Sequence, residues 1–215
     1  MKPNNPYNIV IKNEFYPNGL RELEIYNYWI KNKSKILFQL RDHFCLLYIY
    51  DENNNIIKRR YIKDKQLIQL NDGNYEKIIH GRIVGIVKLF KEKSEYGVID
   101  IDTEERKGIC SPAEFEKCRK TAGELYLYFT KLYKLKLYYS GKNGFHIYCQ
   151  MPKPMNINKI REILSNQLND INKSADLSPN KLNGGVIIPY SLNQIGLPCT
   201  EVKDLKSFSR ESLVI

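Results

Sequence analysis

Two stretches decide how this chain is interpreted, "VIDID" from Val98 to Asp102 and "YYSGKNGFHIY" from Tyr138 to Tyr148. The first reads as a strand. Because alternate side chains of a strand point to the same face, Asp100 and Asp102 are predicted to project side by side. Two carboxylates held that close repel each other unless a cation lies between them. Mg²⁺ and Mn²⁺ prefer oxygen ligands, so the pattern predicts one of these ions at the pair.

The second stretch is an apolar run interrupted by a glycine-containing turn. This turn carries Ser140 and Lys142, and His146 follows on the returning strand. A turn of this kind is a predicted phosphate cradle. Two alternatives stay open: a plain hairpin, since Asn143-Gly144 is a strong type I′ signal, and a core histidine at His146. A cation beside a phosphate cradle predicts phosphoryl or nucleotidyl transfer.

The acidic pair has a plainer interpretation, a solvent-facing strand edge. The apolar neighbours of Asp100 favour a central strand instead, where an uncompensated pair of carboxylates would be costly. A metal-dependent transferase usually needs a further carboxylate from elsewhere in the chain. Asp176 in "SADLSPNK" is the candidate and Asp170 is its rival. Asp176 could equally serve to cap a turn.

Length and charge narrow the class of protein. The 215 residues fit one domain over residues 1–215, with an N-terminal half, 1–95, expected to pack on a catalytic half, 96–215. Hydrophobic residues make up 42% and charged residues 27%, as in globular proteins. The net charge of +10 favours a polyanionic partner such as nucleic acid. The alternative is a general bias toward lysine, asparagine and isoleucine.

No apolar run is long enough for a membrane span, and the N-terminus lacks the apolar stretch of a signal peptide, so a cytoplasmic protein without membrane contact is expected. Five cysteines without a C-x₂-C pair argue against a disulfide framework and a closed zinc site. Cys110 and Cys118 are either the remnant of a metal knuckle or, as we expect, buried thiols.

Periodicity predicts a mixed order of elements and hence an α+β fold. Helices are expected over Leu20–Leu40, from a Ser111 cap to Lys131, and over Ile157–Leu168. Strands are expected at Phe44–Tyr50, Ile56–Ile62, within 77–90, at Gly97–Asp102, Lys134–Ser140 and Phe145–Met151, with Val186–Leu192 as strand or turn.

The order and spacing of these motifs resemble the catalytic small subunit of archaeal and eukaryotic DNA primases, within the primase-polymerase superfamily. That family has a D-x-D strand, an S-G-x-x-G-x-H element, a third aspartate and a Pro-x-Ser-Leu segment. Here these read Asp100/Asp102, Ser140–His146, Asp176 and Pro189–Leu197. "LRELEI", Leu20 to Ile25, resembles the family's R-E-F element.

The resemblance implies mixed and antiparallel sheets flanked by helices, with an RRM-like catalytic core. It implies a primase that synthesises and extends short primers from nucleoside triphosphates on single-stranded DNA, with a large subunit or another replication protein as partner. Asp100, Asp102 and Asp176 would be catalytic and bind Mg²⁺ or Mn²⁺. The implied triphosphate contacts are Ser140, Gly141, Lys142, His146, Ser191, Asn193 and Glu22.

Departures from the family pattern keep other functions open. Asn143, Ile187 and Asn193 stand where the family has basic residues or histidine, so a non-catalytic, primase-like scaffold subunit is one alternative. The polymerase domain of end-joining ligases is another. Its D-x-x-x-N and P-Y-S steps match Asp176–Asn180 and Pro189–Ser191, and its early region resembles residues 38–62. Template phosphates are expected at Lys58, Arg59 and Arg60.

Overall fold

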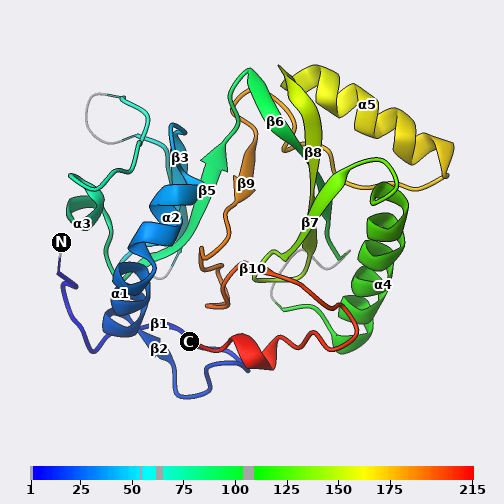
Figure 1. Ribbon diagram of the computed structural model, residues 1–215. Helices are drawn as coiled ribbons and strands as arrows, with labels where there is room; N and C mark the ends of the chain where they lie inside the picture. Colours follow the sequence, from blue (N-terminus) through cyan, green and yellow to red (C-terminus); the bar gives the residue numbers. More distant parts are fainter. Residues whose placement is uncertain (1, 54, 62–64, 104–108) are drawn as a thin grey trace. The chain divides into compact units, whose positions relative to one another are not determined.

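The computed structural model describes residues 2–53, 55–61, 65–103 and 109–215 (Figure 1). The chain folds into two compact units that are interleaved in sequence. Unit 1 contains Met1–Lys88, Ile187–Cys199 and Ser209–Ile215, and unit 2 contains Leu89–Val186 and Thr200–Phe208. The expected boundary between the halves lies at residue 95, and the two units divide after Lys88 and exchange segments again near the C-terminus.

Unit 1 is built on an antiparallel hairpin extended by further strands. Strand β3 (Cys45–Tyr50) pairs antiparallel with β4 (Ile56–Arg59) and with β5 (Ile83–Leu89), and the sheet order is β4-β3-β5-β9, with β9 at Gly185–Ile187. The strands predicted at Phe44–Tyr50 and Ile56–Ile62 are therefore confirmed as far as Arg59, and they pair as a hairpin; Ile62 lies outside the described residues. A second, two-stranded sheet joins β1 (Ile9–Ile11) to β2 (Leu20–Arg21).

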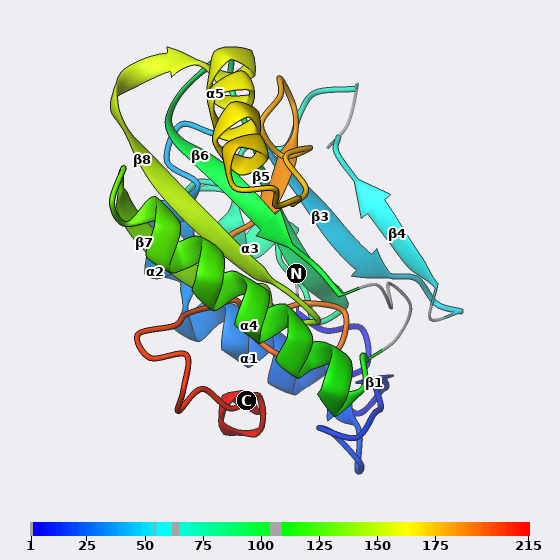
Figure 2. The ribbon, with the colours of Figure 1, turned by 90° about the vertical axis from the view of Figure 1, so that its right-hand side faces the viewer.

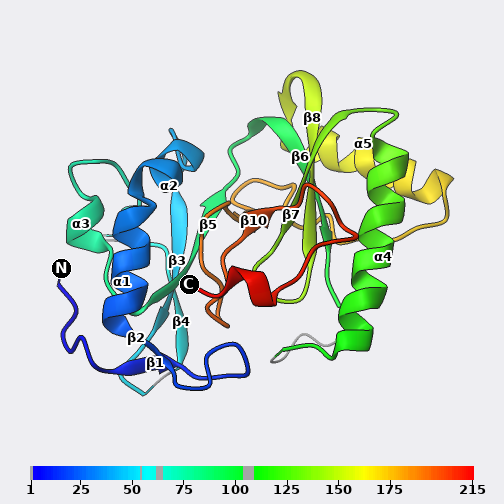
Figure 3. The same cartoon turned by 60° about the horizontal axis from the view of Figure 1, so that its bottom comes forward.

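The long N-terminal helix that periodicity predicted is two helices, α1 (Glu22–Lys31) and α2 (Lys33–Gln39). The break falls at Asn32, whose side-chain amide donates to the carbonyl of Tyr28 at 3.0 Å, alongside its own backbone N–H at 3.1 Å. Asparagine competes in this way for helix backbone groups. Both helices lie along the same side of the neighbouring strands β3 and β5 (Figure 3), and the indole of Trp29 donates to the carbonyl of Ile83.

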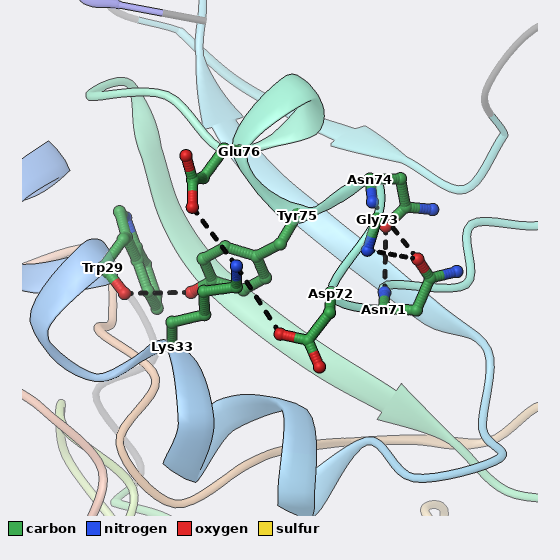
Figure 4. Close-up of polar contacts among 8 residues, drawn as sticks. All are labelled: Trp29, Lys33, Asn71, Asp72, Gly73, Asn74, Tyr75 and Glu76. Carbon is green, nitrogen blue, oxygen red and sulfur yellow. Dashed lines mark hydrogen bonds and ion pairs between the residues drawn. The ribbon is translucent and has the colours of Figure 1, made fainter.

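A turn at residues 71–74 precedes the short helix α3 (Tyr75–Ile78) (Figure 4). The side-chain oxygen of Asn71 accepts the backbone N–H groups of Gly73 and Asn74 at 3.0 and 3.1 Å. The turn and α3 are tied to α1 and α2 by polar contacts. Lys33 lies 3.2 Å from Glu76, and the hydroxyl of the buried Tyr75 donates to the carbonyl of Trp29.

Unit 2 contains the strands β6 (Lys93–Ile101), β7 (Lys134–Tyr139), β8 (Phe145–Asn156) and β10 (Thr200–Glu201) and the helices α4 (Pro112–Phe129) and α5 (Ile157–Asp170). The strands form an antiparallel sheet with the order β10-β7-β8-β6. Helices α4 and α5 lie against β6 and β8 (Figure 2). A Cβ on Gly97 of β6 would lie 2.6 Å from the side chain of Ile160, so this glycine lets α5 approach the strand.

Helix α4 begins as its sequence predicts. The hydroxyl of Ser111 accepts the backbone N–H of Glu114, and Pro112 occupies the first helical position, where a missing N–H costs nothing. Its buried residues recur at helical spacing along one side, Phe115, Cys118, Ala122, Leu125 and Phe129. A last 3₁₀ turn covers Glu211–Leu213.

All five cysteines are buried, as expected for Cys110 and Cys118. Over the described residues, no helix combines the length and the hydropathy that a membrane crossing requires.

Candidate functional site

The candidate site lies on β6 of unit 2 and centres on Asp100. On one side Asp100 is paired with His146 of β8, which is paired in turn with Tyr138 of β7. On the other side Asp100 forms an antiparallel bridge with Asp176: each N–H donates to the other's carbonyl, at 3.0 and 2.9 Å. Directly opposed residues of antiparallel strands share a face. Asp176, Asp100, His146 and Tyr138 therefore form one row across the sheet.

Strand β6 is an edge strand of its sheet, which corrects the prediction of a central strand. The residues around Asp100 are as apolar as those of a central strand, because Val98 and Ile99 are fully buried although the strand lies at an edge. The helices cover one face of the strand, and its outer edge is met by the segment 176–180 in place of a full strand.

The carboxylate of Asp100 contacts the imidazole of His146, with 3.2 Å between Oδ1 and Nε2. His146 is only 5% exposed. Oδ1 of Asp100 is also buried, and it accepts no hydrogen bond from any residue that the structure describes. Buried polar oxygens nearly always have a hydrogen-bond partner, so this atom, which has the His146 imidazole beside it, fits an oxygen ligand of a cation.

Asp102 follows the last residue of β6 and is exposed. Its carboxylate lies against Gly144: a Cβ on that glycine would fall 2.4 Å from Oδ1 of Asp102 and 2.4 Å from the carbonyl of Ile101. The second glycine of the "SGKNG" turn is thus required by the close approach of the acidic strand. The two motifs that the sequence singled out are in contact here.

The "SGKNG" turn closes on itself through Ser140 and Gly144. The N–H of Ser140 donates to the carbonyl of Gly144 at 2.9 Å, and the N–H of Gly144 donates to the Ser140 hydroxyl at 3.2 Å. The left-handed residue is Gly141, with φ of +86°, so the alternative of a type I′ turn at Asn143-Gly144 is wrong. The side chain of Asn143 instead accepts the N–H of Cys110.

Lys142 is half-buried within this turn, and its carbonyl accepts the hydroxyl of Tyr139 at 2.5 Å. The residues of the predicted phosphate cradle thus lie together in unit 2. Ser140, Gly141 and Lys142 belong to the turn between β7 and β8, and His146 belongs to β8.

Asp176 does cap its own turn, as one interpretation of the sequence proposed. Its Oδ1 accepts the N–H of Ser178 at 2.7 Å, and its Oδ2 accepts the Ser178 hydroxyl at 3.0 Å. The rival carboxylate, Asp170, is the last residue of α5, whereas Asp176 is paired with Asp100.

All three predicted aspartates line one open pocket of about 520 Å³. Helix α4 contributes residues that sequence reasoning missed, because nothing in a helical pattern marks which polar positions face a strand end: Glu114, Lys117 and Thr121. The thiol of Cys118 lines the same pocket. Burial raises its pKa to about 12, and the carboxylate of Asp102 adds to this shift.

In the part of the chain that the structure describes, no three His, Cys, Asp or Glu side chains are grouped closely enough to hold a metal ion. The carboxylate of Asp176 is held by Ser178 instead. The donor chemistry nevertheless fits a hard divalent cation, because carboxylate oxygens from Asp100, Asp102 and Asp176 line one pocket and one of them, Oδ1 of Asp100, is buried without a hydrogen bond.

The remaining predicted triphosphate residues belong to unit 1 and have local partners there. Glu22 is 2% exposed, and its carboxylate lies 2.6 Å from Nε of Arg82. The hydroxyl of Ser191, fully buried, accepts the N–H of Ile86 and donates to the carbonyl of Leu192. The side chain of Asn193 accepts the N–H of Gln194. The contacts of Glu22 and Ser191 favour structural roles in unit 1.

Comparison with models of known families and with curated proteins finds no match to this sequence. Among solved structures, the polymerase domain of Ligase D from Mycobacterium tuberculosis, in complex with DNA, is similar, with a TM-score of 0.66. The likeness covers 92% of this chain and 88% of that one, at 12% sequence identity. The chain therefore shares the fold of that polymerase domain. The α+β class and the antiparallel sheets that the sequence predicted are confirmed.

Proposed function

We propose that this chain is a metal-dependent nucleotidyltransferase that adds nucleotides to a 3′-hydroxyl on a DNA template. The observation that carries the proposal is the pairing of Asp100 with Asp176, with Asp102 in the same pocket. The fold shared with a polymerase domain that was solved with DNA supports it.

Asp100, Asp102 and Asp176 would hold Mg²⁺ or Mn²⁺. Such an ion, when bound, supplies charge that offsets the phosphates and favours ionisation of the attacking hydroxyl. Within the chain, Asp176 would release Ser178 to turn its carboxylate toward Asp100. His146 contacts the Asp100 carboxylate and would hold its orientation.

The "SGKNG" turn would receive the triphosphate. Lys142 brings a positive charge to the turn, and Ser140 and Gly144 fix its shape through their mutual hydrogen bonds. Positioning and electrostatic stabilisation supply most of the acceleration in reactions of this class. The lost basic residues at Asn143 and Asn193 predict a weaker affinity for the triphosphate than in relatives that have them.

Template binding would use the basic surface of unit 1. All residues of β4 are exposed, and Lys58 and Arg59 lie on it, followed by the exposed Arg60. Side chains of this kind neutralise phosphates and release counterions, so binding should weaken steeply with salt.

A primer-synthesis assay with labelled nucleoside triphosphates and Mg²⁺ or Mn²⁺ tests the proposal. Incorporation that is lost in Asp100→Ala supports it, and no incorporation with either ion contradicts it.

Two roles fit the same site equally. A primase would form dinucleotides de novo on single-stranded DNA, and a large subunit or another replication protein would stimulate it. An end-joining polymerase would prefer gapped ends with a 5′-phosphate. Parallel assays on the two substrates, with ribonucleotides and deoxyribonucleotides, separate them.

A non-catalytic scaffold that binds nucleic acid is the second candidate function. The capped carboxylate of Asp176 and the absence of a grouped ligand set among the described residues favour it. DNA binding without incorporation under any divalent metal would support this candidate.

A further inference from the structure

The outer edge of β6 is held by a side chain that mimics a strand. The amide oxygen of Asn180 accepts the N–H of Val98 at 2.8 Å, and the amide nitrogen of Asn180 donates to the carbonyl of Val98 at 2.5 Å. Both backbone groups of one residue are therefore satisfied by one side chain, as a paired strand would satisfy them. Asn180 is fully buried.

The same short segment returns to β6 at Asp176. The backbone N–H and C=O groups of Val98 and Asp100 both point outward from the edge of β6. The segment 176–180 binds both residues: Asn180 bonds to Val98, and Asp176 bonds to Asp100. Within the segment, Asn180 donates two hydrogen bonds to the carbonyl of Leu177, one from its backbone N–H at 3.0 Å and one from its side-chain amide at 3.3 Å. Leu177 and Pro179 are buried. The segment is thus a closed loop with both ends fixed on one strand.

We infer that Asn180 is a positioning residue that sets Asp176 beside Asp100. This inference rests on the proposed function for its catalytic consequence. Asn180 would not touch the metal or the nucleotide, because its amide is used by Val98 and Leu177. Its effect passes through the backbone of the 176–180 loop, whose other end is the bridge between Asp100 and Asp176.

Asparagine supplies both hydrogen bonds to the backbone of Val98 from this fully buried position, and the other side chains considered as substitutes do not. Aspartate keeps an acceptor for the N–H of Val98 but loses the donor to its carbonyl, and alanine loses both. Glutamine adds a methylene to a side chain that has no exposed surface. The loss of either bond leaves a buried backbone group of Val98 without a partner, which favours release of the loop from β6.

Native-state hydrogen exchange tests the inference without any assay of activity. In the wild-type protein, the amide of Asp176 should exchange as slowly as those of Val98 and Asp100. In Asn180→Ala and Asn180→Asp, protection at Asp176 should fall by at least about tenfold, and more for alanine. The matched control is Gln167→Ala, which removes hydrogen bonds to the Tyr133 hydroxyl in the same unit and should leave Asp176 protected.

Three exchange results would overturn the inference. The first is fast exchange of the Asp176 amide in the wild-type protein, a result that does not depend on whether any variant folds. The second is unchanged protection in Asn180→Ala. The third is an equal loss in Gln167→Ala, because the effect would then be global.

The functional arm measures the metal requirement. The Mn²⁺ concentration for half-maximal incorporation should rise at least about tenfold in Asn180→Ala, with Asn180→Asp between it and the wild type. A purely structural role would lower the amount of active protein and leave this concentration unchanged, which would overturn the positioning role. If the wild type incorporates no nucleotide, the proposed function fails, and hydrogen exchange still decides whether Asn180 holds the loop.

Discussion

Oδ1 of Asp100 lies 3.2 Å from Nε2 of His146, so the acidic strand and the glycine-turn motif meet through a side-chain contact. The contact follows from the register of β6 and β8, which places these residues directly opposite each other. The pair of Asp100 and His146 needs no loop to assemble it, because two adjacent antiparallel strands are enough.

The first prediction concerns this carboxylate. Asp100→Asn keeps the backbone bridge to Asp176 and the size of the side chain but removes the charge. Incorporation should fall by at least about a hundredfold, as when electrostatic stabilisation is removed from an active site. Steady-state assays measure the loss, and far-UV circular dichroism with thermal melting confirms the fold. Asp102→Asn should behave alike, and retained synthesis with Mn²⁺ in either variant would refute the metal assignment.

The second prediction concerns the turn. Gly144→Ala places a Cβ 2.4 Å from both Oδ1 of Asp102 and the carbonyl of Ile101, so the strand and the turn must separate. Unfolding free energy should fall by about 1–3 kcal/mol, the usual cost of overpacking, and activity should fall with it. Urea denaturation measures the change.

Gly123→Ala is the matched control. Gly123 lies within helix α4, and a Cβ there would contact the side chain of Leu205 at an ordinary van der Waals distance of 3.5 Å. Because alanine is the better helix former, this variant should be more stable by about 0.5–1 kcal/mol. Equal effects of the two substitutions would remove the steric argument at Gly144.

The third prediction separates two roles of Glu22. If its carboxylate serves Arg82, Glu22→Gln should lower the unfolding free energy by about 2–4 kcal/mol, since it leaves a largely buried cation without its partner. A Glu22→Gln, Arg82→Met double variant should lose less than the sum of the two single variants. An activity loss without a stability loss would instead support the triphosphate contact.

The fourth prediction is a pH dependence in unit 1. Burial lowers the pKa of His80 to about 4, against 6.5 in a free side chain, with further lowering from Arg59 and Arg82 and an opposing contribution from Glu22. The unfolded chain therefore binds a proton before the folded one does, so stability from this group is present above pH 6.5 and is lost as the pH falls toward 4. The contribution is on the order of 3 kcal/mol.

The variant His80→Asn checks this prediction. Its amide oxygen can accept the N–H of Arg82, as Nδ1 of His80 does at 3.3 Å. Unfolding free energies measured between pH 4 and 7 should be less steep in the variant than in the wild type. Parallel curves for the two proteins would show that His80 does not titrate as described.

The sequence predicted most elements and the residues on them, and its failures have physical causes. The break at Asn32 depends on a side-chain hydrogen bond that periodicity does not contain. The edge position of β6 was missed because the burial of Val98 and Ile99 depends on helices and a loop rather than on strands at both sides.

Within the site, the sequence predicted the residue types and their order. It did not predict the left-handed conformation at Gly141, which the closed turn requires, or the amide of Asn180 on the strand edge. It also did not show that Glu22 and Ser191, which it assigned to the triphosphate, each have a buried partner in unit 1; their triphosphate roles stay predictions. Contacts between residues distant in the chain decide such cases, and spacing does not record them.

A crystal structure with Mn²⁺ and a non-hydrolysable nucleoside triphosphate tests the central claim most directly. We predict Mn²⁺ bound by Asp100, Asp102 and Asp176, with the Asp176 carboxylate turned away from Ser178 and the triphosphate against the "SGKNG" turn. Mn²⁺ bound elsewhere, with Asp176 still accepting from Ser178, would contradict the account.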